Sequence, residues 1–202
     1  MQKQTYVCRS YFSYKAGAKG ATIGSMNRTL ILMRHAKSDW NQSGLSDKDR
    51  PLNARGNDAA PRMARWLLEQ GILPDRVCCS SAVRTRETLD WILRVFGEAE
   101  QAKRTEIAYF DELYLAPSER ILRVANDVWR QFPDEPVLLM LGHNPGMEDL
   151  VSELSGQPTS MPTAAIAIFC CEEAVADGIS EHGVSFSKFR LTHFQAPKKL
   201  AT

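Results

Sequence analysis

Near its thirtieth residue the chain reads Thr29-Leu30-Ile31-Leu32-Met33-Arg34-His35, an apolar run that ends on an arginine and a histidine. The pattern recurs as Val137-Leu138-Leu139-Met140-Leu141-Gly142-His143. Short apolar runs of this kind are typical of strands buried inside a parallel sheet. Each run therefore delivers a histidine at the carboxyl end of a strand, which is the edge where open α/β sheets bind ligands.

Strands and helices alternate along the chain after residue 28. We expect strands over residues 29–34, 76–80, 105–110, 137–141, 164–171 and 184–191. We expect helices over residues 82–96, 118–131 and 146–154, and an earlier one that opens at 53–56 and ends at Gly71. This order predicts an α/β fold of three layers, in which a mostly parallel central sheet carries helices on both faces. The last two strands are expected to form an antiparallel edge pair.

The first 27 residues differ from the rest of the chain. They contain no acidic residue and show no hydrophobic period. We expect residues 1–27 to be a disordered extension and residues 28–202 to form a single catalytic domain. A transit peptide is the alternative interpretation of the extension, since such peptides are basic, rich in serine and poor in acids.

The composition indicates a soluble protein of a reduced compartment, and we expect a cytoplasmic location. No apolar run approaches the ~18–20 residues of a membrane span. The five cysteines include two adjacent pairs, which is not the pattern of a disulfide framework. The net charge is +1, and the chain after residue 28 is mildly acidic, which argues against a nucleic-acid partner. No His, Cys and Asp spacing matches a metal site, so we expect neither metal nor cofactor.

Three segments carry the residue types of phosphate chemistry. The guanidinium of Arg34 suits a phosphate group, and His35 can act as a nucleophile or a base. In Ser80-Ser81-Ala82-Val83-Arg84 a strand passes into a helix, whose first N–H groups favour an anion. Arg84 can reach that anion, or it can be a solvated helix charge. His143 lies between glycines that permit a close backbone approach, which is less typical of a core histidine.

These motifs together resemble the histidine phosphatase superfamily, which has the phosphoglycerate mutase-like fold. Residues 34–36, Arg-His-Ala, are similar to its Arg-His-Gly signature, with alanine in place of glycine. The SixA-type phosphohistidine phosphatases are similar over further segments. These are Asp-Arg-Pro-Leu-Asn-Ala-Arg-Gly at 49–56, the Ser-Ser-x-x-Arg run from residue 80, Gly-His-Asn-Pro-Gly at 142–146, Met-Pro-Thr-Ala at 161–164 and Pro-Lys-x-Leu at 197–200.

The resemblance implies a role for each matching residue. His35 would be the nucleophile that becomes phosphorylated, and Arg34, Arg84 and His143 would line the phosphate pocket. Arg50 would be a further phosphate ligand, although it could instead be a loop charge paired with an acid at position 47 or 49. Ser38 and Asn41 are similar to the serine and asparagine that follow the signature in the mutase branch. The resemblance implies that these two residues also touch phosphate.

The substrate depends on the leaving group. An alkoxide needs a positioned acid, whereas imidazole, with a pKa of roughly 6.5, needs little help. Glu112, after the third expected strand, is a candidate acid, but it can equally be a solvated loop residue. We therefore expect a metal-independent phosphatase that acts on phosphohistidine of a phosphorylated protein, for example a phosphotransfer domain. The alternatives are a phosphatase of small phosphomonoesters and a non-catalytic phosphate-binding module.

Overall fold

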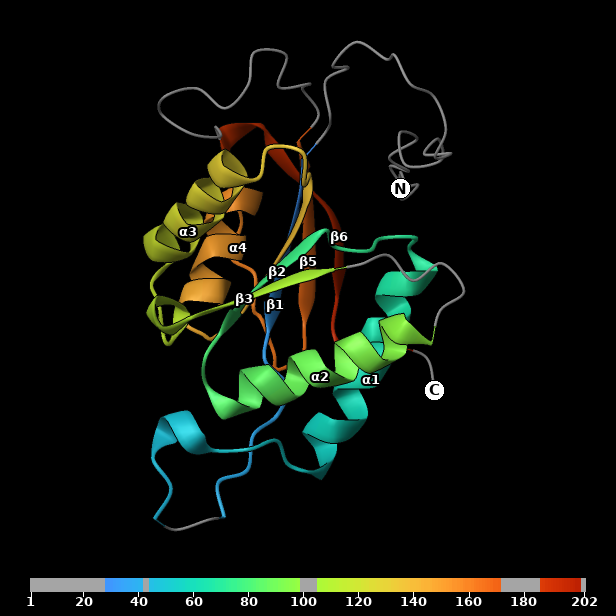
Figure 1. Ribbon diagram of the computed structural model, residues 1–202, viewed down its shortest axis with the longest axis vertical. Coiled ribbons are helices and arrows are strands. Elements are labelled where there is room, and N and C mark those ends of the chain that lie inside the picture. The colour runs from blue at the N-terminus through green and yellow to red at the C-terminus, as the bar shows by residue number, and fades with distance from the viewer. Residues whose placement is uncertain (1–27, 42–43, 99–104, 172–185, 201–202) are drawn as a thin grey trace.

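A computed structural model describes residues 28–41, 44–98, 105–171 and 186–200. Its centre is a six-stranded sheet with the order β3-β2-β4-β1-β5-β6 (Figure 1). The strands are β1 (Thr29–Arg34), β2 (Arg76–Ser80), β3 (Glu106–Phe110), β4 (Val137–Gly142), β5 (Ile166–Cys171) and β6 (Phe189–Gln195). Strands β1 to β4 run parallel to one another. Strand β5 is antiparallel to both of its neighbours, β1 and β6. The predicted α/β class and the antiparallel edge pair are confirmed.

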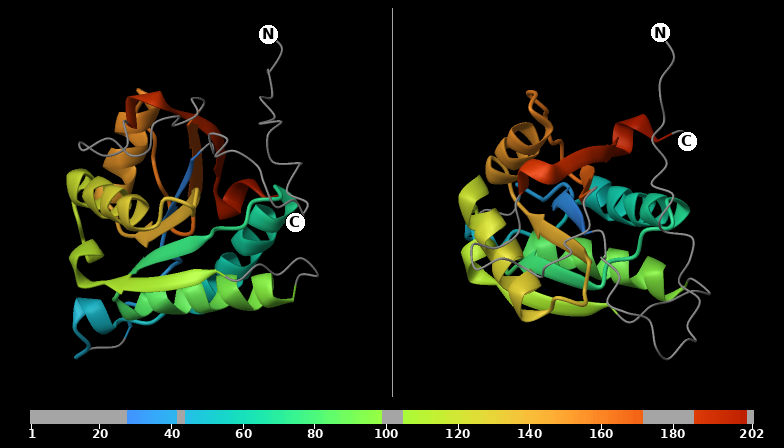
Figure 2. Two further views of the ribbon diagram at one scale, coloured as in Figure 1. Left: turned by 45° about the horizontal axis from the view of Figure 1, so that its top comes forward. Right: turned by 90° about the horizontal axis from the view of Figure 1, so that it is seen from above.

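Four helices cover the two faces of the sheet. They are α1 (Ala54–Glu69), α2 (Val83–Gly97), α3 (Ser118–Gln131) and α4 (Gly146–Ser155). The views agree that α1 and α2 lie on one face and that α3 and α4 lie on the other (Figure 2). The three-layer arrangement predicted from the sequence is therefore present.

Two separate cores explain why β1 is apolar at successive positions. Side chains of a strand alternate between its faces. Ile31 and Met33 pack in the core beneath α1 and α2, whereas Leu30 and Leu32 pack in the core beneath α3 and α4. All four side chains are fully buried. A strand covered on both faces cannot carry the polar alternation of a half-exposed strand.

Close backbone contacts fix where the helices begin. The side chain of Asn53 accepts a hydrogen bond from the Gly56 N–H and caps α1. Gly56 lies against the Lys37 carbonyl, and Gly146 lies against the Ala116 carbonyl, so closely that a Cβ at either glycine would collide with it. The starts of α1 and α4 are thereby held against the loops that follow β1 and β3.

The last strand differs from the expectation. The sequence predicted a strand over residues 184–191, of which 184 and 185 lie outside the described residues. The strand β6 spans Phe189–Gln195, and a short 3-10 turn, η4 (Phe186–Lys188), precedes it. The segment 189–195 alternates less regularly because β6 is an edge strand, most of whose residues are only partly buried. The predicted disordered extension at residues 1–27 lies outside the described residues. Within those residues, no helix has the length and apolar character needed to cross a membrane.

Gly146→Ala should lower the free energy of unfolding by about 1–3 kcal/mol, because the added methyl group meets the Ala116 backbone, which has little room to move. Urea denaturation followed by circular dichroism measures the change. Gly97→Ala is the matched control, because no atom lies within 4 Å of a Cβ added there. Equal stability of the two variants would contradict the close contact.

Candidate active site

The two predicted histidines meet at the carboxyl edge of the sheet. Strands β1 and β4 are neighbours, and their register places Arg34 beside Gly142. The residue after each strand end is therefore a histidine, and the ring centroids of His35 and His143 lie 5.0 Å apart. The backbone of His35 is held on both sides, since its N–H donates to the Gly142 carbonyl and its carbonyl accepts from the Ala164 N–H.

His35 has one ring nitrogen free of a proton. Its Nδ1 lies 2.7 Å from the Ala36 carbonyl oxygen, which can only accept, so Nδ1 carries the proton. Its Nε2 therefore keeps a lone pair and accepts from Arg84 Nε at 3.3 Å. Burial lowers the pKa of His35 to about 3, against the hydrogen bond to Ala36, and the nearby guanidinium charges add to the lowering. The result is a neutral imidazole with a lone pair at Nε2.

His143 is also a buried, neutral imidazole. Its Nε2 lies 2.8 Å from Ser80 Oγ, at the end of β2. Its Nδ1 is buried and has no hydrogen-bond partner among the described residues. Burial lowers the pKa of His143 to about 2, with further lowering by His35 and Arg84. The Nδ1 atom therefore has a hydrogen-bonding capacity that no described residue uses.

Three arginines surround the histidine pair. Arg84, in the first turn of α2, and Arg50, in the loop after β1, are 3% and 8% exposed. Arg34 donates from Nη1 to the Met161 carbonyl at 2.8 Å, and burial lowers the pKa of Arg34. We call these arginines and the two histidines the arginine–histidine cluster. Such a group of buried cations requires an anion.

Asp47 supplies that anion, and the sequence analysis did not identify it as a site residue. It begins a 3-10 turn, η2 (Asp47–Asp49), which lies beyond the carboxyl edge of the sheet (Figure 1). Its carboxylate accepts from Arg84 Nη2 at 2.9 Å and from Arg50 Nη1 at 3.0 Å. The hydroxyl of Tyr114 donates to it at 2.7 Å, and this bond and the two arginines lower the pKa of Asp47.

Arg50 pairs with Asp47, as the loop-charge interpretation predicted, and Asp47 also pairs with Arg84. Its role as a phosphate ligand stays a prediction. Its Nη2 donates to the buried hydroxyl of Ser38 at 2.5 Å. The spacing of Asp47 and Arg50, three residues apart in one turn, was the only signal in the sequence for this link.

Two predicted site residues lie apart from the cluster. The carboxylate of Glu112 forms an ion pair with Arg120 of α3 at 2.8 Å. Asn41 is exposed, and its backbone N–H bonds the Asp39 side chain. Among the described residues, neither side chain bonds a member of the arginine–histidine cluster, and no group of three His, Cys, Asp or Glu side chains is placed to hold a metal ion.

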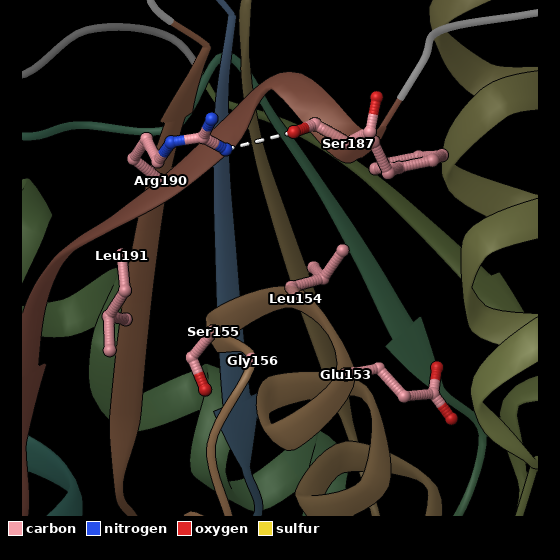
Figure 3. A pocket seen from close by; sticks show the side chains of 8 residues that line it. Glu153, Leu154, Ser155, Gly156, Ser187, Arg190 and Leu191 are labelled. Carbon is pink, nitrogen blue, oxygen red and sulfur yellow. Dashed lines mark hydrogen bonds between the residues drawn. The ribbon is translucent and has the colours of Figure 1, made fainter.

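A cavity lies away from this cluster. It has a volume of about 530 Å³ and lies between the end of α4 and the start of β6 (Figure 3). Arg190 points along its upper edge and bonds the Ser187 carbonyl (Figure 3). Its other lining residues include Glu153, Leu154 and Leu191. None of its lining residues belongs to the arginine–histidine cluster.

Comparison with known proteins identifies the class. Residues 30–109 match the histidine phosphatase superfamily (branch 1). An uncharacterized protein of Mycobacterium tuberculosis is 34% identical over 152 residues, which are 73% of this chain and 84% of that protein. An uncharacterized chloroplastic protein of Arabidopsis thaliana is 33% identical over 145 residues, which are 71% of this chain and 66% of that protein.

Solved structures agree with this class. A protein assigned as phosphohistidine phosphatase SixA from Agrobacterium tumefaciens has a TM-score of 0.67 at 28% identity, over 84% of this chain and 98% of that one. Its counterpart from Nakamurella has a TM-score of 0.66 at 28% identity, over 86% and 98% of the two chains. The chain belongs to the histidine phosphatase superfamily, and it is a phosphatase by class.

The similarity to phosphoglycerate mutases covers a shorter part of the chain. A 2,3-bisphosphoglycerate-dependent phosphoglycerate mutase of Afipia carboxidovorans is 32% identical over 90 residues, which are 44% of each chain. The chain thus aligns with less than half of that mutase and with about two thirds of the plant relative.

Neither ring of the histidine pair should titrate between pH 5 and 8 in the ligand-free protein, because burial disfavours the imidazolium and lowers both pKa values far below 6.5. Histidine ring resonances followed by NMR test this, with His35→Ala and His143→Gln used for assignment. In urea the same two resonances should titrate near pH 6.5. A midpoint near 6.5 in the folded protein would contradict the buried neutral pair.

Proposed function

We propose that this phosphatase removes the phosphoryl group from phosphohistidine on a protein, with His35 as the nucleophile and without a metal. The observation that carries the proposal is the state of His35. Its Nδ1 proton is held by the Ala36 carbonyl, and its Nε2 lone pair lies within the arginine–histidine cluster. A neutral imidazole among cations suits attack on a phosphoryl group, because the cations offset the charge on the phosphoryl oxygens.

The reaction would proceed in two steps. In the first, Nε2 of His35 attacks phosphorus in line, a bond from phosphorus to Nε2 forms, and the bond to the leaving nitrogen breaks with its electron pair on that nitrogen. In the second, water attacks phosphorus, a bond from phosphorus to the water oxygen forms, and the bond to Nε2 breaks with its electron pair on Nε2. Inorganic phosphate leaves, the remaining proton of the water passes to solvent, and His35 returns to its neutral form. Arg34, Arg84 and His143 Nδ1 would bind the phosphoryl oxygens, and Arg50 would add a further cation.

A protein substrate is favoured by the surroundings of the cluster. The connection from β3 to α3 is short, residues 111–117, so it carries no long insertion. The ring of Trp40 stacks on the Arg50 guanidinium at 3.3 Å and is 71% exposed. In the segment after β3, Leu115 is 48% exposed and adopts a positive φ of 49°, which is uncommon for leucine. These exposed apolar side chains suit contact with a second protein.

Similar solved structures support the same substrate class. Two of them are assigned as SixA phosphohistidine phosphatases at 28% identity. A leaving imidazole has a pKa of roughly 6.5, so it needs less help from an acid than an alkoxide does. Glu112 is engaged with Arg120, which is consistent with a reaction that does not depend on it as an acid.

His35→Ala should lower the removal of phosphate from a phosphohistidine-bearing phosphotransfer protein by about a thousandfold or more, because the nucleophile is lost. The rate is followed by loss of the phosphohistidine signal, with a parallel assay on an aryl phosphate. His193→Ala is the matched control, because His193 lies on edge strand β6, outside the cluster. Turnover of the aryl phosphate alone by the wild type would contradict a phosphohistidine substrate, and equal activity of the His35 variant would contradict the nucleophile.

Glu112→Gln tests the second candidate function, a phosphatase of small phosphomonoesters. If Glu112 protonates an alkoxide, the change should slow ester hydrolysis by about a hundredfold or more and leave phosphohistidine hydrolysis nearly intact. Because its carboxylate is paired with Arg120, we expect both rates to change by less than about threefold. Steady-state kinetics on an alkyl phosphate and a phosphohistidine protein separate the two outcomes.

A further inference from the structure

Asp47 is an unexpected residue for a phosphate pocket. A phosphate dianion binds more strongly where cations are unopposed, yet Asp47 places a negative charge between Arg84 and Arg50. Its side chain is 44% exposed, whereas those of the two arginines are 4% and 10% exposed. The carboxylate therefore lies on the outer, solvent side of the arginines.

The side chain of Arg84 lies between Asp47 and His35, the proposed nucleophile, and contacts both. Arg84 Nε lies 3.3 Å from His35 Nε2, and Nη2 of the same guanidinium lies 2.9 Å from Asp47 Oδ2. A phosphoryl group in line with His35 Nε2 would have its leaving group on the side away from that nitrogen. Asp47 Oδ1 accepts only from Arg50 among the described residues, so it retains a lone pair for a further donor.

Phosphohistidine has such a donor. One ring nitrogen bears the phosphoryl group, and the other carries a proton when the ring is an imidazolium. From the imidazolium form the leaving group is neutral imidazole, with a parent pKa of roughly 6.5. From the unprotonated form it would be the imidazolate anion, a far poorer leaving group. A carboxylate beside the distal nitrogen favours the protonated, reactive form.

We propose that Asp47 binds the protonated distal ring nitrogen of a phosphohistidine substrate and thereby selects this substrate over phosphomonoesters. The inference rests on the proposed function. The bond from phosphorus to the substrate nitrogen breaks as the bond to His35 Nε2 forms. The electron pair goes to the leaving nitrogen, the distal proton stays on its nitrogen beside Asp47, and neutral imidazole departs. Phosphomonoesters have no proton donor at that place, so they meet only the repulsion of the carboxylate.

The charged and titratable groups around Asp47 come from four elements. Arg50 faces it from its own loop, Arg84 from α2, Tyr114 from the segment after β3 and His143 from the segment after β4. Lys48 and Asp111 form an ion pair with each other farther out. The arginines and the Tyr114 hydroxyl keep the pKa of Asp47 lowered, so the carboxylate remains an anion at neutral pH.

The test compares two substrates over a range of pH. Asp47→Asn keeps the shape and one acceptor oxygen but removes the charge, and kcat/KM is measured from pH 6 to 8.5 on a phosphohistidine protein and on 4-nitrophenyl phosphate. We expect the ratio of the phosphohistidine rate to the aryl phosphate rate to fall at least about tenfold at pH 8. At pH 6 the fall should be smaller, because solution protons then protonate the substrate ring.

The control is Asp49→Asn, since Asp49 lies in the same turn and its carboxylate bonds the Ser46 hydroxyl instead of an arginine. It should leave the ratio and its pH dependence as in the wild type. If Asp47 only positioned the arginines, both substrates would lose activity in parallel at every pH, and the proposal would be overturned. A wild type that hydrolyses the aryl phosphate but no phosphohistidine would instead overturn the proposed function, and this role with it.

Discussion

The parallel pairing of β1 with β4 is the constraint on which the site depends. Its register sets the ends of both strands at the same level, so that the residues that follow, His35 and His143, come within contact of each other. The pairing is possible only because helices cover both faces of the sheet, which is why both strands are apolar at nearly every position. Fold and site thus arise from the same two short stretches of sequence.

Electrostatic balance is the second constraint. Buried cations need a compensating anion, and buried imidazoles stay neutral. Asp47 provides the compensation for Arg84 and Arg50, while the Ala36 carbonyl fixes the proton of His35 on the inner nitrogen. The Nε2 atom of His35, the proposed nucleophile, is thereby left without a proton and beside positive charge. Each element of the proposed chemistry depends on this distribution of protons and charges.

The sequence predicted the parts of this protein that follow from periodicity and strand ends. The α/β class, the two histidines at one edge and the approach of Arg84 all follow from local patterns. The position of β6 did not, because an edge strand buries only part of its surface and carries a weaker pattern. Asp47 was missed for a different reason. Its partners Arg84 and Tyr114 are distant in the sequence, and only the folded chain brings them together.

The contact between Gly146 and Ala116 has a consequence for how such a site can change. It ties the segment after β3 to the first residue of α4, which lies three positions beyond His143. A longer segment at 111–117 would either keep that contact or shift the turn that carries His143. Variation or engineering that lengthens this segment is therefore coupled to the position of His143. An insertion there preserves that position only if it leaves Ala116 where it is.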